Sequence, residues 1–279
     1  MQFLTDLTHP NEQRRYKIVT AKEALMNRTY VCADVHAHLD CFEEALKCLD
    51  ETDRLFVIGD AVDKGPNRME VLQKIMDDPR CEMLIGNHDL MMLQYLTVAD
   101  YIENHDPETI PVDVIYLYNE IAYRWAELND GLETLTAYRA LAEDEQKRIL
   151  EYLKNCPLKK NVTVNGKEFI LVHAAIPAEA EDDLCDAEVL YLDLIQDPEK
   201  PYRYDYKTDW VWGRYSVQVS GKYVVTGHTM VQTFRTDHIK RMGDWFDIDC
   251  GLAARFDRSS LALFCLDDFS VQYFKPKVL

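Results

Sequence analysis

Acidic, amide and imidazole side chains suited to metal binding recur along the chain, each just after a short apolar run that predicts a β-strand. The residues that carry this pattern are Asp34 and His36, Asp60 and Asp63, Asn87 and His88, then His173 and His228. In an open α/β sheet, ligands bind outside the carboxyl ends of the strands, so five such strand ends can converge on one pocket. Mixed carboxylate, amide and imidazole ligands suit a divalent ion such as Mn, Fe or Zn.

The order and spacing of these elements carry more weight than any one of them. A GD or GNH triplet alone is usually a turn with a capping side chain, and a lone histidine at a strand end is usually a satisfied core residue. Here Asp60 lies 26 residues after Asp34, His88 lies 28 residues after Asp60, and two further histidines follow. The combined set therefore predicts a metal-dependent active site.

Alternating strands and helices provide the frame that would hold these side chains. The first part of the chain predicts strands at 29–34, 54–60 and 81–86, with helices at 41–49, from Pro66 onward and at 90–102. Such alternation is typical of a largely parallel sheet with helices packed on its faces. Later strands are predicted at 161–164, 169–172, 223–226, 245–248, 261–266 and 270–274. We therefore expect an α/β protein.

The pattern also suggests how the chain is divided. The predicted parts are an N-terminal extension at 1–28, a single domain at 29–279 and a helical insertion within it at about 104–157. The insertion is predicted because 116–128 and 143–153 have helical periodicity and no strand pattern lies between them. The acidic, proline-containing stretch 178–209 is expected to be a long surface loop.

Charge and composition narrow the class of protein. The chain has 279 residues, 47% of them hydrophobic, and a formal net charge of −18. That charge would repel a phosphate backbone or an anionic bilayer, so neither nucleic acid nor a membrane is an expected partner. Bound cations would still allow a phosphorylated substrate. The eight cysteines are scattered and no apolar stretch resembles a signal peptide, so we expect reduced thiols and a cytoplasmic protein.

Taken together, the motifs resemble those of the PPP-type phosphoprotein phosphatases within the calcineurin-like metallophosphoesterases. That family shows GDxHG, GDxVDRG, GNHE, a later H(G/A) and a final GH; the counterparts here are ADVHA, GDAVDKG, GNHD, His173-Ala174 and Gly227-His228. His173-Ala174-Ala175-Ile176-Pro177 and Trp212-Gly213-Arg214 look like phage-type versions of the later motifs. The resemblance runs from about Val31 to the C-terminus. It is strongest to small bacterial and phage-type serine/threonine protein phosphatases and to symmetrical dinucleoside tetraphosphatases.

The resemblance implies a fold and a role for individual residues. The fold would be an α/β calcineurin-like sandwich of two central mixed β-sheets flanked by helices. Two divalent ions, Mn first with Fe or Zn as alternatives, would be held by Asp34, His36 and Asp60 and by Asp60, Asn87, His173 and His228. Asp60 would bridge the ions, and a hydroxide activated by them would attack phosphorus in line. His88 matches the family's general acid, Asp63 would orient it, and Lys64 and Arg214 fall where the family places phosphate-clamping arginines.

This sequence departs from the family motifs at several positions. Ala33 and Ala37 replace glycines that set backbone shape rather than chemistry. Lys64 replaces an arginine. Arginine can bind two phosphate oxygens at once, whereas lysine offers a single compact charge. Asp89 replaces the glutamate after GNH and is expected to support its neighbours rather than to bind metal. Met230 stands where broader metallophosphoesterases have a second histidine, which favours the PPP-like branch.

Three functions are compatible with these residues. The first is hydrolysis of phosphoserine and phosphothreonine in proteins. The second keeps the chemistry but acts on a dinucleoside tetraphosphate or another small phosphorylated molecule, for which the acidic 179–199 stretch offers few basic residues. The third is an inactive relative that binds phosphorylated partners, and the presence of all six ligand positions argues against it. We expect the first, with a phosphorylated protein or small molecule as partner; the sequence leaves the oligomeric state open.

Overall fold

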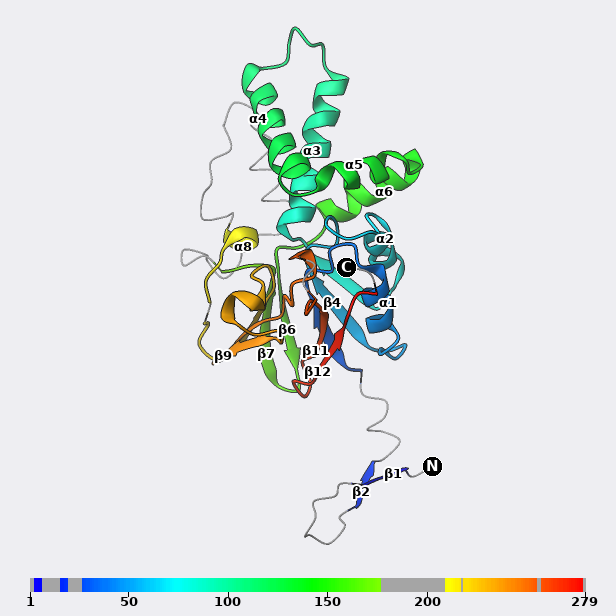
Figure 1. Cartoon of the computed structure of the whole chain (residues 1–279), viewed down its shortest axis with the longest axis vertical. Helices are drawn as coiled ribbons and strands as arrows, with labels where there is room; N and C mark the ends of the chain where they lie inside the picture. The colour runs from blue at the N-terminus through cyan, green and yellow to red at the C-terminus, as the bar shows by residue number, and fades with distance from the viewer. Residues whose placement is uncertain are drawn as a thin grey trace.

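Two mixed five-stranded β-sheets form the centre of the fold (Figure 1). The computed structural model describes residues 3–6, 16–19, 27–176, 209–216, 218–254 and 257–277. The first sheet has the order β12 (Val271–Phe274), β11 (Leu261–Cys265), β3 (Thr29–Cys32), β4 (Arg54–Ile58) and β5 (Cys81–Leu84). The second has the order β6 (Lys159–Val164), β7 (Lys167–Val172), β8 (Tyr223–Thr226), β10 (Trp245–Asp247) and β9 (Lys240–Met242).

Parallel pairing brings the carboxyl ends of several strands to a common edge in each sheet. β3, β4 and β5 are parallel neighbours in the first sheet, and β7, β8 and β10 are parallel neighbours in the second. The two edges meet, because the ring nitrogen Nδ1 of His173, just after β7, lies 2.8 Å from the carbonyl oxygen of Ile58 at the end of β4. Residues that follow strands of both sheets can therefore share one site.

Side chains of both sheets form the core between them. Val31 and Phe56 of the first sheet belong to the same buried cluster as Phe169, Val225 and Phe246 of the second. Neighbouring residues on β3 and β4 belong instead to a cluster shared with the helices. Burying one large apolar side chain contributes about 1.5–3 kcal/mol to the free energy of folding. The alternation of the two clusters along each strand therefore determines which of its residues face the other sheet.

Helices pack beside the first sheet and form a layer at one end of the molecule (Figure 1). Beside the sheet lie α1 (Leu39–Leu46) and α2 (Glu70–Asp77). The end layer contains α3 (Asn87–Asn104), α4 (Val112–Ala122), the π-helical turn η2 (Tyr123–Glu127), α5 (Gly131–Arg139) and α6 (Glu143–Lys154). The short elements are α8 (Asp209–Trp212) and the 3-10 turns η4 (Val231–Phe234) and η5 (Leu252–Ala254).

The segment at about 104–157 has one helix more than its hydrophobic periodicity predicted. The predicted helix at 116–128 is divided into α4 and η2, and α6 matches the prediction at 143–153. α5 was not predicted, because its buried face consists of Gly131, Thr134, Leu135 and Tyr138. Only half of these residues are strongly apolar, so the hydrophobic periodicity is weak there.

Several predicted boundaries were wrong by a few residues. β3 ends at Cys32 and β4 at Ile58, each two residues before the predicted end. The reason is that Asp34 and Asp60 have φ angles of 52° and 57°, a left-handed conformation that cannot continue a strand. The helix expected from Pro66 begins at Glu70, and the short strand β9 was not predicted.

The remaining predictions concern the N-terminal extension and the loop. Within the extension, β1 (Phe3–Asp6) and β2 (Tyr16–Val19) pair in an antiparallel register that the sequence did not predict. The loop predicted at 178–209 lies outside the described residues, apart from Asp209 at the start of α8.

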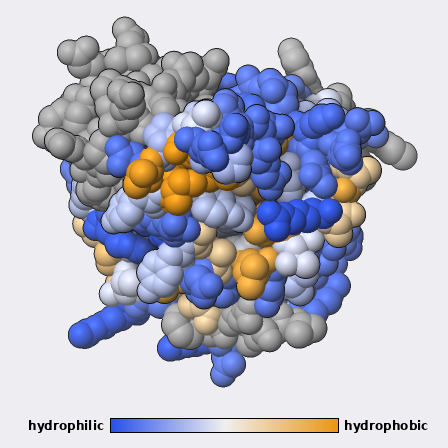
Figure 2. Space-filling model, turned by 90° about the horizontal axis from the view of Figure 1, so that it is seen from above, coloured by the Kyte–Doolittle hydropathy of each residue, from blue (hydrophilic) through white to orange (hydrophobic). Residues whose placement is uncertain are grey.

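The surface at the helical end is mostly hydrophilic, with a small group of apolar residues (Figure 2). The apolar side chains exposed on the inserted segment include those of Val112, Ile115, Leu128 and Leu132. Among the helices of the described ranges, none combines the length and apolar composition needed to cross a bilayer.

Candidate metal centre

Six buried side chains gather where strands of both sheets end and where α3 begins. They are Asp34, His36, Asp60, Asn87, His173 and His228, each at most 7% exposed. Asp34 and His36 follow β3, Asp60 follows β4 and Asn87 opens α3, while the two later histidines follow β7 and β8. The structure thus brings together all six residues that the family motifs imply as metal ligands.

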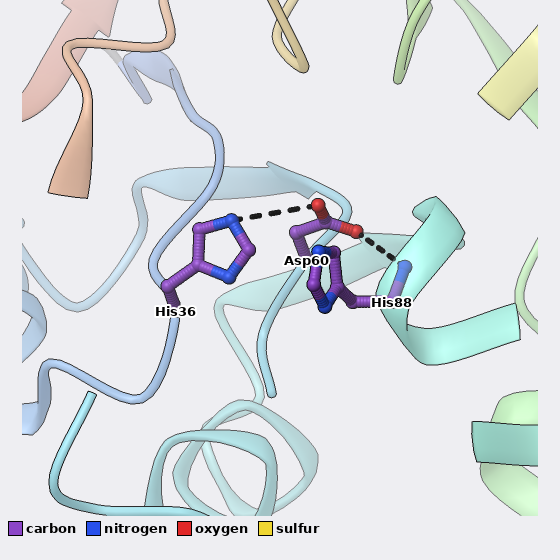
Figure 3. A group of neighbouring side chains, drawn as sticks. All are labelled: His36, Asp60 and His88. Atoms are coloured by element: carbon purple, nitrogen blue, oxygen red, sulfur yellow. Dashed lines mark hydrogen bonds and ion pairs between the residues drawn. The ribbon is translucent and has the colours of Figure 1, made fainter. Parts of the chain in front are cut away.

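Asp60 lies between His36 and His88 (Figure 3). Its Oδ2 is 3.5 Å from Nε2 of His36 and 3.5 Å from Nε2 of His173, and its Oδ1 accepts a 2.9 Å hydrogen bond from the backbone N–H of His88. Two sets of possible ligands share this carboxylate, each with its ligand atoms within 4.8 Å of one another: His36, Asp60 and His88, and Asp60, His173 and His228. A carboxylate in this position can contact two ions at once.

Asp34 and Asn87 flank the shared carboxylate. Asp34 lies 4.0 Å from His36 through its Oδ1 and accepts a hydrogen bond of 3.0 Å at Oδ2 from the backbone N–H of His228. The Oδ1 atom of Asn87 is 3.0 Å from Nε2 of His173. Each of the two sets therefore has an additional oxygen donor beside it.

The backbone at this site adopts the left-handed conformation at an unusually large number of residues. The residues concerned are Asp34, His36, Ala37, Asp60, Asp63, Lys64 and His228, with φ angles between 44° and 67°. L-residues rarely adopt this conformation, and it persists where the surrounding structure enforces it, often at functional sites. Ala37 stands at a position where the family motif has glycine, so this departure concerns backbone shape, as expected.

Burial makes the carboxylates of the cluster difficult to charge. It raises the pKa of Asp34 and of Asp60 well above the ordinary value. The neighbouring charge of Asp249 raises the pKa of Asp34 further, and that of Asp89 raises the pKa of Asp60 further. Nearby cations would reverse this effect, because they stabilise the ionised carboxylates.

Burial keeps the imidazoles of the cluster neutral. It lowers the pKa of His36, and it lowers the pKa values of His173 and His228 to about 3 and about 2. Neutral imidazole is the form that binds metal ions. Nε2 of His228 is buried and has no hydrogen-bond partner among the residues that the structure describes. An unsatisfied buried nitrogen lowers the stability of the folded protein by about 1–3 kcal/mol, and a cation coordinated by this nitrogen would remove that cost. The donor set fits divalent cations.

Asp89 supports the backbone of the site, as expected. Its carboxylate accepts hydrogen bonds from the backbone N–H groups of Asp60, Ala61 and Gly86, at 2.7, 3.0 and 2.9 Å. These bonds connect the segments that follow β4 and β5. Gly86 is required there because a Cβ atom would collide with the Asp60 side chain.

His88, the residue that matches the family's general acid, forms a buried pair with Asp63. Its Nδ1 lies 2.6 Å from Oδ2 of Asp63. Burial, with a contribution from the charge of Lys64, lowers the pKa of His88 to about 3, and burial raises the pKa of Asp63 to about 7. The pairing uses Nδ1 and leaves Nε2 as the ring nitrogen that can face a leaving group.

Two partners of Asp63 were missed by the sequence analysis. Nε1 of Trp125 donates a 2.9 Å hydrogen bond to Oδ2 of Asp63, and Oγ1 of Thr134 donates a 2.5 Å hydrogen bond to Oδ1. They lie 62 and 71 residues after Asp63 in the sequence, too far for any local pattern to connect them. The dipeptide Asp130-Gly131, at the start of α5, lies between them.

Asp247 and Asp249, at and just after the end of β10, were also missed. Both are buried, and burial raises the pKa of Asp249 to about 6. The positive charge of Arg214 opposes the rise in both carboxyl groups. An Asp-x-Asp pair after an apolar strand is the signal that could have identified them.

Lys64 and Arg214 both lie next to the cluster. Lys64 is 18% exposed, and its Nζ is 3.9 Å from Oδ2 of Asp130, a residue of the insertion. Its charge contributes to lowering the pKa of His88. Nη1 of Arg214 donates a 3.3 Å hydrogen bond to the carbonyl oxygen of His228. Two cationic side chains therefore stand beside the cluster.

Comparison with known proteins gives a match over most of the chain. The family model described as calcineurin-like phosphoesterase matches residues 28–232. A symmetrical bis(5'-nucleosyl)-tetraphosphatase of Coxiella burnetii (strain Dugway 5J108-111) is 29% identical over 157 residues, 54% of this chain and 43% of that protein. The protein of the same name from Erwinia tasmaniensis is 38% identical over 72 residues, 23% of this chain and 25% of that protein. The matches thus span less than half the length of these curated relatives.

A solved structure has the same fold. It is described as a candidate diadenosine tetraphosphatase and matches with a TM-score of 0.52 at 12% identity, covering 89% of this chain and 93% of that chain. At this identity the likeness concerns the fold alone. The predicted α/β sandwich of two mixed sheets flanked by helices is confirmed.

Proposed function

The chain belongs to the calcineurin-like phosphoesterase family, and on that basis we propose a dinuclear metal-dependent phosphoesterase. The observation that carries the proposal is the shared position of Asp60 in two buried sets of ligands. The proposed ligands are Asp34, His36 and Asp60 for one ion, and Asp60, Asn87, His173 and His228 for the other. When bound, two divalent ions supply positive charge and activate water for in-line attack on phosphorus. We propose Mn first, with Fe or Zn as alternatives.

The side chains around the ligands carry the remaining steps. In its protonated form, His88 would donate the proton of Nε2, the ring nitrogen that Asp63 does not occupy, to the oxygen that leaves phosphorus. Lys64 and Arg214 would bind the phosphoryl oxygens and offset the negative charge that develops on them.

For the substrate we place a dinucleoside polyphosphate ahead of a phosphoprotein, which reverses the order expected from the sequence motifs. The names of the relatives support this order. A cavity of about 80 Å³ beside Arg214 supports it as well, because Tyr215, Phe234 and Trp245 line it. Aromatic side chains stack on nucleobases, and such stacking is worth about 1–3 kcal/mol per base.

A phosphoprotein is the second candidate. The observation in its favour is the phage-type motif Trp212-Gly213-Arg214, which places the arginine beside His228. We also propose a reducing, cytoplasmic compartment, because scattered cysteines in a chain of this length are typical of reduced thiols.

A metal-titrated activity screen tests the proposed function. Protein stripped with a chelator is expected to lose phosphoesterase activity, and Mn is expected to restore it best, because the ligands combine oxygen and nitrogen donors. Among restored activities, hydrolysis of a dinucleoside tetraphosphate is expected to exceed that of a phosphothreonine peptide at equal concentration. Full activity after verified metal removal would disprove the metal mechanism. A preference for the phosphopeptide would instead support the serine/threonine protein phosphatase activity expected from the sequence motifs.

Replacing Lys64 by alanine is expected to lower kcat/KM on an aryl phosphate at least tenfold, equivalent to about 1.4 kcal/mol. The reason is the loss of a positive charge that would offset the negative charge developing on the phosphoryl oxygens. Lys64→Arg is expected to keep most of the activity, since the family motif has arginine there. Asp130→Asn is the control, because it removes the ion-pair partner of Lys64 and keeps the lysine. If Lys64→Ala keeps its metal content and its kcat/KM stays within about twofold of wild type, Lys64 has no role in catalysis and is only a hydrated charge on the turn between β4 and α2.

A further inference from the structure

The helical insertion reaches the metal centre through one fully buried carboxylate, that of Asp63. His88 and Trp125 both lie within hydrogen-bond distance of its Oδ2, at 2.6 and 2.9 Å, and Thr134 donates to its Oδ1 at 2.5 Å. The three partners come from three elements, α3, η2 and α5. Two of these elements belong to the insertion and contribute nothing to the ligand set.

This arrangement fixes the plane of the Asp63 carboxylate. A carboxylate bonded only to His88 could rotate about its terminal torsion, which is broad for aspartate. Thr134 holds one oxygen while Trp125 and His88 share the other, so such a rotation would break at least one hydrogen bond. Hydrogen bonds to a charged group in a buried site are also the stronger kind. The orientation of the His88 ring is therefore connected to the insertion.

The insertion is built to place the indole of Trp125 at this position. Trp125 is fully buried, and its ring packs against Tyr95 of α3 with centroids 5.3 Å apart. Gly131 at the start of α5 lies so close to the indole that a Cβ atom would overlap three of its ring atoms. The tryptophan itself lies in a π-helical turn, an irregularity frequent at functional sites. A buried indole N–H requires an acceptor, and the acceptor here is Asp63.

From this geometry we infer that Trp125 and Thr134 are positioning residues for leaving-group protonation: they hold Asp63 so that Asp63 holds His88. Neither residue touches the ligand cluster through a hydrogen bond of its own. The inference rests on the proposed function, because it depends on the role of His88 as the acid. The helical insertion would then contribute to catalysis, a role that the motifs alone do not assign to it.

Thr134→Val tests the inference with the smallest change, because valine keeps the shape and removes the hydroxyl. On an alkyl phosphate, which needs a protonated leaving oxygen, kcat is expected to fall about tenfold with KM within twofold, a part of the ~10²–10⁴-fold that a general acid contributes. On para-nitrophenyl phosphate, whose leaving group needs little protonation, the loss is expected to be under twofold. Thr134→Ser, which restores a hydroxyl, should recover most of the alkyl phosphate activity.

One control and a second test variant make the outcome decisive. Thr136→Val makes the same change in the same helix, at an exposed hydroxyl that donates to the carbonyl oxygen of Leu132 within the helix. It should affect neither substrate. Trp125→Phe removes the indole N–H and should repeat the selective loss of Thr134→Val. Equal losses of Thr134→Val on both substrates, no loss on the alkyl phosphate, or failure of serine to rescue would each overturn the inference.

The same measurements separate this inference from the proposed function. If wild-type protein with verified metal content hydrolyses no phosphate ester, the proposed function fails. If the wild type is active and His88→Asn shows the selective loss while Thr134→Val does not, the acid role holds and the inference about the insertion is wrong.

Discussion

Replacing Asp60 by asparagine is expected to lower kcat/KM by three orders of magnitude or more, about 4 kcal/mol. Asp60 is the one carboxylate that both ligand sets share, so this substitution takes a negative charge from both ions at once. Asparagine has nearly the same shape, and its oxygen can still accept the hydrogen bond from the backbone N–H of His88. The variant should therefore fold and fail to hold its metals. Metal content, thermal unfolding and kcat/KM on para-nitrophenyl phosphate measure these three properties separately.

Asp53→Asn is the matched control for that experiment. Asp53 is also buried, and its carboxylate accepts backbone hydrogen bonds of 2.8 Å from Arg28 and Asp50, away from the ligand cluster. This variant should lower the free energy of unfolding and leave metal content and turnover unchanged. If Asp60→Asn still bound two metal equivalents and turned over near the wild-type rate, Asp60 could not be the bridging ligand.

The gathering of the candidate ligands could be predicted because its signal is local and repeated. Asp34, Asp60 and Asn87 each follow a short apolar strand, and parallel strands place such positions at one edge of a sheet. What the sequence did not predict is the backbone conformation there. The left-handed φ angles of Asp34 and Asp60 end each strand two residues early. Aspartate adopts this conformation more often than most residues, but its presence in a sequence does not show where it does so.

The residues that position His88, the proposed general acid, could not be predicted, and the reason is different. Trp125 and Thr134 reach Asp63 from 62 and 71 residues away, and the helix that carries Thr134 has too weak a hydrophobic periodicity to be predicted. A threonine on a buried helix face and a tryptophan in a helical segment are ordinary in sequence. Their role is visible only when the hydrogen bonds of Asp63 are followed in three dimensions.

His88→Asn is expected to lower kcat about 10²–10⁴-fold on an alkyl phosphate and less than tenfold on para-nitrophenyl phosphate. The protonated imidazole would give its Nε2 proton to a leaving alkoxide, a poor leaving group, whereas para-nitrophenolate leaves readily without help. Asparagine keeps the backbone N–H that donates to Asp60, so the bridging carboxylate stays in place. A series of aryl phosphates with leaving groups of rising pKa should therefore show a steeper dependence of rate on leaving group in the variant than in the wild type.

Metal content decides how that result is to be understood, because His88 also lies within one of the two possible ligand sets. An acid that binds no metal can be lost without loss of metal, whereas loss of a ligand lowers occupancy and slows all substrates alike. The 2.6 Å contact between Nδ1 and Asp63 fits either role, because metal-binding histidines also commonly donate their other ring N–H to a carboxylate, so metal occupancy is the deciding measurement. His105→Asn, at the exposed C-terminal end of the same helix, is the control and should change neither occupancy nor rate. Equal losses of His88→Asn on all leaving groups, with reduced metal content, would make His88 a ligand and require another residue as the acid.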